Sequence, residues 1–227
     1  MKIGREEFLA RTPLFKGVGP KALEEMLADC RRCEYAKGEA IENDEGLEWF
    51  NILLEGRVKL QQTDPVTGRS FVSFLLEQGD VFDVIALLDG EEHVTMPVAV
   101  LPTVLLRVPM REAREWLKRY PEFNEALLPY LGEQMRHLES FAESVIFDDT
   151  ATRLARLILR HARPEAEDEK ILAVEHISHE LLAEMIGSVR SVVTTQLNRL
   201  KEEGLILHRR GKIIVENLEG LLQRYGL

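Results

Sequence analysis

The sequence predicts an α+β protein with an N-terminal antiparallel, jelly-roll-like β-roll, a long helix and a C-terminal winged helix-turn-helix. Three observations support this fold class. Short β-type runs separated by glycines fill residues 39–108, which is typical of a small antiparallel barrel or roll. Residues 121–147 form a long helical stretch with regularly spaced apolar residues. Residues 176–215 divide into two short helices, a glycine turn between them and a hairpin.

Residues 1–120 form the predicted β-roll with its flanking helices. Helical patterns cover residues 8–14 and 20–33 at the start and residues 110–120 at the end. The β-type runs are residues 39–41, 49–54, 57–62, 70–76, 98–101 and 103–108. Because so many short strands alternate with glycine turn signals, we expect an antiparallel sheet that rolls on itself.

Residues 121–147 are predicted to be a dimerisation helix that ends in a hinge. The apolar residues at alternating four- and three-residue steps are Leu131, Met135, Leu138, Ala142 and Val145. This spacing is typical of a coiled-coil seam between two copies, although a helix packed on its own domain shows it too. Pro129 is expected to break or bend the helix near its start.

Residues 148–227 form the third predicted domain, with a helix over residues 152–162 and a charged loop over residues 163–170. Ser178 is expected to N-cap a helix over residues 179–186, because its side-chain oxygen can accept a hydrogen bond from a backbone N–H. Gly187 supplies the turn. Ser188 is expected to cap a second helix that continues to about residue 203.

The second of these helices has an apolar and a polar side. The buried stripe is expected to contain Val189, Val193, Leu197 and Leu200. The polar side carries Arg190, Ser191, Thr194, Thr195 and Asn198. These side chains can form hydrogen bonds with the edges of bases in a major groove. The alternative interpretation is an ordinary small domain with two amphipathic helices and a hairpin, without a role in DNA binding.

A basic hairpin tip follows, between predicted strands at residues 206–208 and 213–215. The tip residues Arg209, Arg210 and Lys212 are expected to contact phosphates and to carry little sequence information. With the polar side of the helix and the caps Ser178 and Ser188, they complete the candidate DNA-binding set. We therefore predict that residues 148–227 are a DNA-binding domain.

The net charge of −10 is distributed unevenly and does not argue against DNA. Residues 1–147 carry 17 basic and 26 acidic residues, whereas residues 148–227 carry 12 and 13. Within residues 187–212, six basic residues stand against two acidic ones, where phosphates would lie. No apolar run approaches the ~18 residues of a membrane helix, and the N-terminus has no signal-peptide core. We expect a cytoplasmic protein without a membrane partner.

Several segments resemble the CRP/FNR family of bacterial transcription regulators. They are LLEGRVKL at residues 53–60, QGDVF at 78–82, FDDTATRLARLI at 147–158 and the helix-turn-helix. The resemblance covers nearly the whole chain and implies a sequence-specific transcription regulator whose cyclic-nucleotide-binding-like β-roll is a sensor domain. It also implies a homodimer whose two recognition helices contact successive major grooves of a pseudo-palindrome, with RNA polymerase as a further partner.

The resemblance also bears on cyclic AMP. Members that bind cyclic nucleotides hold the ribose and cyclic phosphate with a Gly-Glu pair and an Arg-Ser or Arg-Thr pair. The family's glutamate falls on Val84 and its arginine on Val94, and only Thr95 keeps a hydroxyl. A buried phosphate without a guanidinium would lose charge-assisted hydrogen bonds of ~1.5–3 kcal/mol each. We therefore expect that cyclic AMP does not bind.

The same segment offers an apolar lining that suits a hydrophobic ligand. The candidate effector-pocket residues are Val81, Phe82, Val84, Ile85, Leu87, Val94, Thr95 and Leu138. Haem is one hypothesis, because the family contains haem-based gas sensors and because His93 and His137 are the imidazoles best placed to ligate iron. We favour the alternatives, which are a different apolar ligand or no ligand, because such histidines are more often solvated or packed.

Cys30 and Cys33 form a CRRC motif that is expected at the end of a helix, with both thiols on one face. The flanking Arg31 and Arg32 would favour the thiolate, so a redox pair is one hypothesis. Two half-buried structural cysteines are the favoured one. Iron–sulfur members of the family use four cysteines, so two cannot hold such a cluster within one subunit.

An oxidoreductase built on the CRRC motif is the competing class of function. The chain lacks the thioredoxin-like βαβ context that gives such a motif its meaning. It also shows no convincing nucleophile–base set elsewhere. We therefore expect a regulator and not an enzyme, with a haem- or thiol-based sensor regulator as the second hypothesis.

Overall fold

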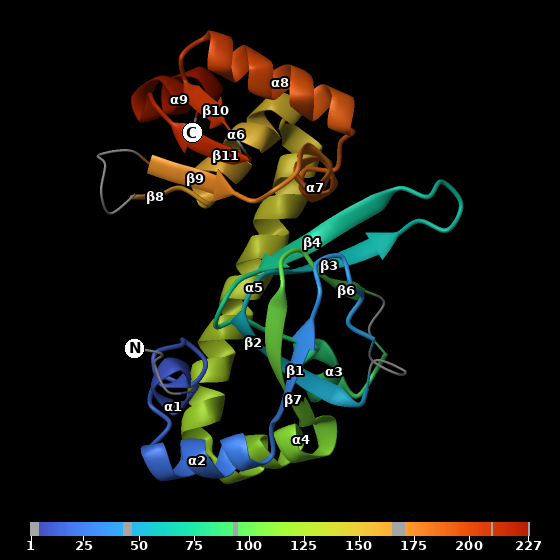
Figure 1. The fold of residues 1–227 in the computed structure, drawn as a ribbon, viewed down its shortest axis with the longest axis vertical. Helices are drawn as coiled ribbons and strands as arrows, with labels where there is room; N and C mark the ends of the chain where they lie inside the picture. The colour runs from blue at the N-terminus through green and yellow to red at the C-terminus, as the bar shows by residue number, and fades with distance from the viewer. Residues whose placement is uncertain (1–4, 43–46, 93–94, 165–170, 210, 227) are drawn as a thin grey trace. The chain divides into compact units, whose positions relative to one another are not determined.

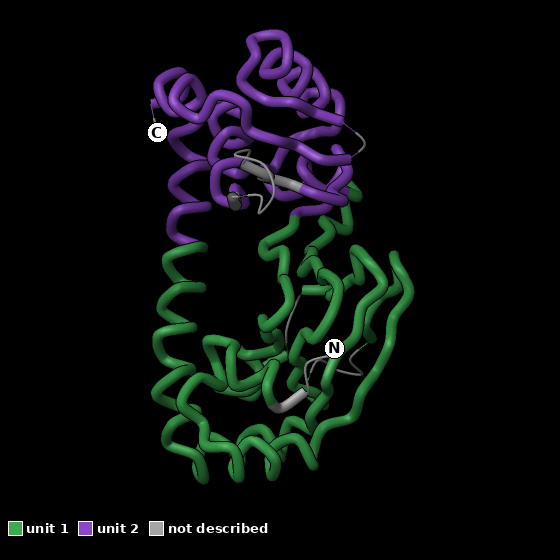
Figure 2. The backbone as a smooth tube through the Cα atoms, turned by 60° about the vertical axis from the view of Figure 1, so that its left-hand side comes forward, with its two compact units in different colours: residues 1–68, 72–137 green, residues 69–71, 138–227 purple. Residues whose placement is uncertain are grey.

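The computed structural model describes residues 5–42, 47–92, 95–164, 171–209 and 211–226. It divides into two compact units (Figure 2). The first unit contains residues 1–68 and 72–137, and the second contains residues 69–71 and 138–227. The division falls within one helix, α5 (Pro121–Phe147), whose bounds are those of the helix predicted from the sequence.

Two antiparallel sheets form the β-roll of the first unit (Figure 1). One sheet has the strand order β1-β7-β2-β5 and the other has the order β4-β3-β6. The strands are β1 (Arg31–Tyr35), β2 (Trp49–Glu55), β3 (Val58–Thr63), β4 (Ser70–Leu76), β5 (Val81–Phe82), β6 (Met96–Ala99) and β7 (Thr103–Pro109). The predicted α+β fold with an antiparallel roll is confirmed. The predicted strand at residues 39–41 is reduced to one bridge, between Ala40 and Val98.

Strand β2 is buried on both faces of its sheet, which explains its nearly continuous apolar sequence. Phe50, Ile52 and Leu54 belong to a large cluster that includes residues of the helices. Leu53 points the other way, into a smaller cluster inside the roll. Successive side chains of a strand alternate between its faces, so one strand connects both clusters.

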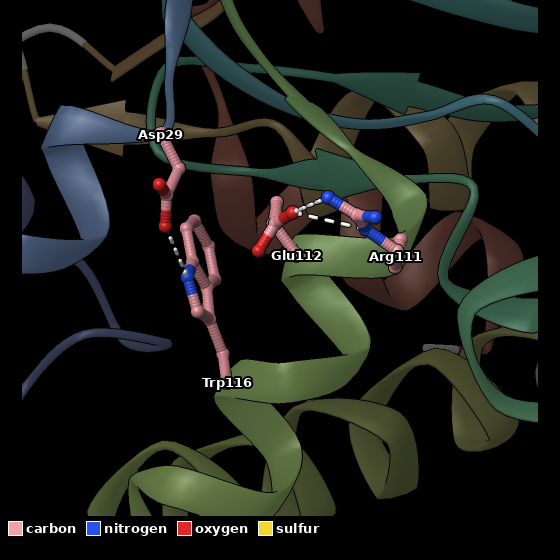
Figure 3. A network of polar contacts seen from close by, with 4 residues as sticks. All are labelled: Asp29, Arg111, Glu112 and Trp116. Atoms are coloured by element: carbon pink, nitrogen blue, oxygen red, sulfur yellow. Dashed lines mark hydrogen bonds and ion pairs between the residues drawn. The ribbon is translucent and has the colours of Figure 1, made fainter.

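Four short helices and the first part of α5 accompany the sheets of this unit. They are α1 (Arg5–Leu9), α2 (Pro20–Ala28), α3 (Val84–Asp89) and α4 (Met110–Arg119). Trp116 on α4 packs edge-on against Phe50, with ring centroids 6.4 Å apart, and against Phe123 of α5 at 5.9 Å. Its indole Nε1 donates to Asp29 over 3.4 Å, while Arg111 and Glu112 pair at the start of α4 (Figure 3). Aromatic packing thus fixes α4 and α5 on the sheet.

One sequence prediction about these helices is wrong. The helix expected over residues 20–33 ends at Ala28, because residues 31–35 pair with β7 as strand β1. Of the break or bend expected at Pro129, the break does not occur, because α5 continues through this residue. Phe123, Leu127 and Tyr130 are buried on one side of α5 around this position, and such packing compensates for the hydrogen bond that proline cannot donate.

The backbone conformation between β2 and β3 requires the glycine of the LLEGRVKL segment, Gly56. Its φ of +94° lies in the left-handed region. A Cβ added there would lie 2.5 Å from the carbonyl oxygen of Pro102 and 2.8 Å from Thr103 Cα. Because both contacts are with backbone atoms, only glycine fits between β2 and β3.

The second unit combines helices with a four-stranded sheet of order β10-β11-β9-β8 (Figure 1). Its elements are α6 (Thr150–Arg160), β8 (Arg163–Pro164), β9 (Ile171–Glu175), α7 (His179–Met185), α8 (Arg190–Glu202), β10 (Ile206–Arg209), β11 (Lys212–Val215) and α9 (Leu218–Tyr225). The sequence predicted α6, α7, α8 and the hairpin, but not β8, β9 or α9. Part of the predicted charged loop, residues 165–170, lies outside the described residues.

Candidate nucleic-acid interface

Helices α7 and α8 form the helix-turn-helix (Figure 1). Ser178 caps α7 as predicted, because its hydroxyl accepts from Leu181 N over 3.1 Å. Gly187 makes the turn with a φ of +62°. The prediction that Ser188 caps the second helix is wrong. The N-cap position of α8 is Val189, without a side-chain hydrogen bond, while Ser188 N donates to the Ala183 carbonyl and closes the turn.

The inner side of α8 is buried and fixes the helix within its unit. Val193, Leu197 and Leu200 are at most 1% exposed, as the predicted stripe requires. Val189 was expected in this stripe, but 44% of its surface is exposed. It precedes the first helical turn and does not follow the helical periodicity, which explains the error.

The outer face of α8 consists of Arg190, Ser191, Val192, Thr195 and Asn198, which are all exposed. Among the described residues, the Arg190 guanidinium has no ion-pair partner. An arginine at the start of an exposed helix can pair with guanine O6 and N7, the commonest specific contact in the major groove. Four of the five predicted α8 contact residues therefore lie on one accessible surface.

The fifth predicted α8 contact residue, Thr194, is held inside its own unit. Its hydroxyl donates to the Arg190 carbonyl over 2.9 Å and lies 2.8 Å from His179 Nδ1. The ring of His179 packs against that of His208 on β10, with centroids 4.9 Å apart. Burial, and then the nearby His179 and Lys201, lowers the pKa of His208. These contacts connect α7, α8 and the hairpin.

The hairpin formed by β10 and β11 provides the basic tip that the sequence predicts. Arg209 is exposed and lies opposite Lys212 in the register of the two strands. Arg210, which was also predicted to contact DNA, lies outside the described residues. Lys212 is not available as a simple point charge, because its Nζ lies 2.6 Å from a carboxylate oxygen of Glu175. The sequence analysis missed this acidic partner because β9 was not recognised as the neighbour of β11.

The junction between α5 and α6 is fixed by the two aspartates of the FDDTATR segment. Asp149 caps α6 by accepting a hydrogen bond from Thr152 N over 2.8 Å. Hydrogen bonds from the backbone and side chain of Thr152 lower the pKa of Asp149. Asp148 pairs with Arg156 over 2.7 Å. The segment predicted as a hinge therefore contains a specific helix cap and an ion pair.

The predicted effector-pocket residues are divided between two buried clusters and the surface of the described chain. Val81 and Leu87 are buried in the large cluster, Phe82 is buried in the smaller one, and Ile85 is 54% exposed. Val84 is partly buried against the large cluster. Thr95 is half-buried, Leu138 is exposed, and Val94 lies outside the described residues. The apolar segment thus serves mainly as core.

Asp83 in this segment belongs to a set of buried and half-buried polar side chains that the sequence analysis missed. We call Tyr35, Asn51, Asp83 and Arg107 the Asp83 network. Asn51 Nδ2 donates to Asp83 over 2.6 Å, and its Oδ1 accepts from Arg107 Nε over 3.1 Å. Arg107 also donates to the Tyr35 hydroxyl over 3.0 Å. Burial raises the pKa of Tyr35, and Arg107 opposes that shift. An asparagine within the apolar run of β2 was the available signal.

Other candidate ligand groups have contacts within the chain. His137 Nε2 lies 3.1 Å from the Ser73 carbonyl, and its ring packs on Phe74 at 4.8 Å. The second predicted haem ligand, His93, lies outside the described residues. Within those residues, no group of three or more His, Cys, Asp or Glu side chains is placed to hold a metal ion.

The predicted placement of the CRRC motif is wrong. Cys30 follows the end of α2, and its thiol donates to the Met26 carbonyl over 3.3 Å. Cys33 lies in β1 opposite Leu105. The two half-buried thiols are not joined in a disulfide and do not share a helix face, because the chain changes from helix to strand between them.

The predicted seam of α5 is largely uncovered in the isolated chain. Met135, Leu138, Ala142 and Val145 are exposed, while Leu131 packs partly against the core of the first unit.

Across the described residues, no helix has both the length and the apolar character needed to cross a membrane.

Comparison with known proteins identifies relatives of this arrangement. A family model for the Crp-like helix-turn-helix domain matches residues 152–224. The Global nitrogen regulator of Synechocystis is 30% identical over 178 residues, which cover 76% of this chain and 78% of that protein. The Cyclic AMP receptor protein of Thermus thermophilus is 28% identical over 213 residues, which cover 93% of this chain and 94% of that protein.

The fold has counterparts among solved structures. A transcriptional regulator of the CRP/FNR family from Thermus thermophilus matches with a TM-score of 0.68 and 24% sequence identity. The match covers 87% of this chain and 99% of that one. At this identity the likeness concerns the fold, and it includes both the β-roll and the helix-turn-helix.

Proposed function

Because this chain belongs to the CRP/FNR family and is a DNA-binding transcription regulator, we propose that it binds a pseudo-palindromic site as a homodimer. One α8 helix would lie in the major groove of each half-site, with the half-sites about one helical turn apart. The observation that carries this proposal is the outer face of α8, where Arg190 is exposed and has no ion-pair partner among the described residues. The protein would act in the cytosol, with DNA and RNA polymerase as its partners.

The wing would contribute affinity more than specificity. Arg209 is exposed at the hairpin tip, and a basic side chain there suits phosphate contacts, which position a protein on DNA without distinguishing bases. To contact a phosphate, Lys212 would have to give up its ion pair with Glu175. We therefore expect Lys212 to contribute less to DNA affinity than Arg209. Sequence preference would then come mainly from Arg190 and its neighbours on α8.

Dimerisation would use the exposed apolar residues of α5. Met135, Leu138 and Val145 are 64%, 43% and 45% exposed in the isolated chain, and a second copy of the helix would bury them. Leu138→Glu would place two carboxylates against each other in that interface, which is unfavourable unless they protonate or move apart. Leu138→Glu should therefore shift the protein to monomer.

Sedimentation at micromolar concentration, with DNA binding measured in parallel, tests this proposal. The matched control is Glu143→Gln, an exposed position on the same helix outside the apolar seam. We expect a dimer for wild type and for the control, and a monomer with weakened operator binding for Leu138→Glu. A variant that stays dimeric would exclude this part of α5 as the principal interface.

We also propose that cyclic AMP is not the effector. Val84 offers neither charge nor a hydrogen bond, and the neighbouring Asp83 carboxylate is already bound to Asn51. A buried cyclic phosphate would also lack the guanidinium that the family resemblance places at the position of Val94. Calorimetric titration of the full chain with cyclic AMP should show no binding, whereas a micromolar dissociation constant would contradict this assignment.

A further inference from the structure

The outer face of α8 is less polar than its sequence suggests. Thr195 Oγ1 donates to the Ser191 carbonyl over 3.0 Å, in the same way as Thr194 Oγ1 donates to the Arg190 carbonyl. The hydroxyl hydrogen of Thr195 is therefore used within the helix. What Thr195 offers to a ligand is its Cγ2 methyl group and an oxygen that can only accept.

Val192 adds a second apolar group to this face. It is 36% exposed and lies three residues before Thr195, so the two side chains are neighbours on consecutive turns. Buried residues on the other side of α8, Val193 and Leu197, show that Val192 is not part of the packed stripe. A single exposed valine needs no explanation, but this one lies one helical turn from a threonine that is also exposed.

The chemistry that suits these methyl groups is that of thymine. In the major groove thymine presents a C5 methyl group, and apolar contact with threonine methyl groups is a recognised way to distinguish it. Cytosine, in contrast, presents a hydrogen-bond donor and no methyl group there. The Thr195 hydroxyl donates its hydrogen to the helix backbone. It therefore contributes little to the recognition of a base that presents only hydrogen-bond acceptors.

We infer that Val192 and Thr195 form an apolar contact with the C5 methyl group of a thymine in the half-site that α8 contacts. This inference rests on the proposed function, because it assumes that α8 lies in the major groove. It makes Val192 a specificity-determining residue, although it is not one of the polar residues that would be chosen from the sequence. It also makes recognition depend on a methyl group as well as on hydrogen bonds.

Replacing thymine by uracil tests the inference, because this change removes the C5 methyl group and preserves every hydrogen-bonding group of the base pair. A preferred half-site is first selected from randomised duplexes with the full-length protein. Each thymine of that site is then replaced in turn by uracil, and dissociation constants are measured at one salt concentration. We expect one position at which uracil weakens binding about fourfold, the effect of removing one buried methyl group.

Three variants assign the effect to the helix. Thr195→Ser keeps the hydroxyl and removes the methyl group, Val192→Ala shortens the apolar side chain, and Asn198→Ala is the matched control on the same face. The uracil penalty should shrink towards onefold in Thr195→Ser or Val192→Ala and persist in Asn198→Ala. Because the altered positions are exposed, thermal unfolding should stay close to wild type and shows that each variant is folded.

The possible failures are distinguishable. If wild type selects a defined site but tolerates uracil at every thymine, the methyl contact is excluded while the proposed function stands. A penalty of equal size in wild type, Thr195→Ser and Val192→Ala would also overturn the inference, because the contact would then belong to another residue. If wild type selects no site at all, both the proposed function and this inference fail.

Discussion

The outer face of α8 and the segment of the β-roll that begins at Asp83 both depart from the residues expected of nucleotide-dependent relatives. The family's recognition helix presents an arginine, then a glutamate, then a second arginine four residues on, and these positions fall on Arg190, Ser191 and Thr195. The departures at Ser191 and Thr195 lie on an exposed surface where Arg190 has no ion-pair partner within the described chain. In the β-roll, Asp83 is 5% exposed and bound to Asn51, while Val81, Phe82 and Leu87 are packed as core. The named side chains of the first region are exposed, whereas those of the second are buried.

The difference shows that similar amounts of sequence change have different consequences in the two regions. On an open surface, a new side chain changes which ligand fits and costs little stability, because it has few contacts to lose. In a packed segment, a new side chain must fit its buried neighbours, so the same kind of change costs more stability. We therefore expect altered DNA specificity from α8, and we expect the Asp83 network to contribute to stability.

The largest effect on stability is expected from the buried side of α8. Leu197 is fully buried, so Leu197→Ala should destabilise the second unit by about 2–5 kcal/mol. Asn198→Ala, on the exposed side of the same helix, should change stability by less than about 0.5 kcal/mol. Urea denaturation followed by circular dichroism, with hydrogen exchange of α8 amides, measures both. Equal effects would mean that the two sides of α8 are not distinguished by burial.

A smaller effect is expected from the Asp83 network. Asp83→Ala leaves the Asn51 amide without the carboxylate that it contacts at 2.6 Å, and it places alanine at a φ of +64°. We expect a loss of about 1–3 kcal/mol, measured by the fluorescence of Trp49 and Trp116 during urea unfolding. Asp83→Asn keeps a side-chain oxygen and should lose less. If Asp83→Ala is as stable as wild type, the network does not hold this segment.

The smallest effect concerns the pH dependence of the second unit. Because burial lowers the pKa of His208 in the folded state, the unfolded chain takes up this proton more readily than the folded chain. Stability from this group is thus present above its ordinary pKa of about 6.5 and is lost as the pH falls through that value to the lower folded pKa. His208→Gln should flatten the dependence between about pH 7 and 5. An unchanged slope would assign the dependence to other groups.

The sequence was sufficient for the architecture and for the exposure of most of the DNA-binding candidates, because periodicity, helix caps and glycine turns are local signals. Ser178 and Gly187 were assigned correctly for this reason. Interactions between distant segments could not be predicted. The ion pair of Lys212 with Glu175 and the hydrogen bond of Asn51 with Asp83 both depend on strand pairing. The CRRC motif was misplaced because two cysteines three residues apart look alike in a helix and at a helix–strand junction.

The central claim is that the outer face of α8 determines which DNA is bound, and selection on randomised half-sites tests it most directly. Arg190→Ala should flatten the preference at one base position, with a loss of about 1–3 kcal/mol of discrimination. The matched control, Arg209→Ala on the wing, should weaken binding to all sequences alike. It should also lower the slope of log affinity against log salt concentration by about one, which corresponds to one lost phosphate contact. If Arg190→Ala selects the same motif as wild type with undiminished preference, α8 is not the element that recognises the bases.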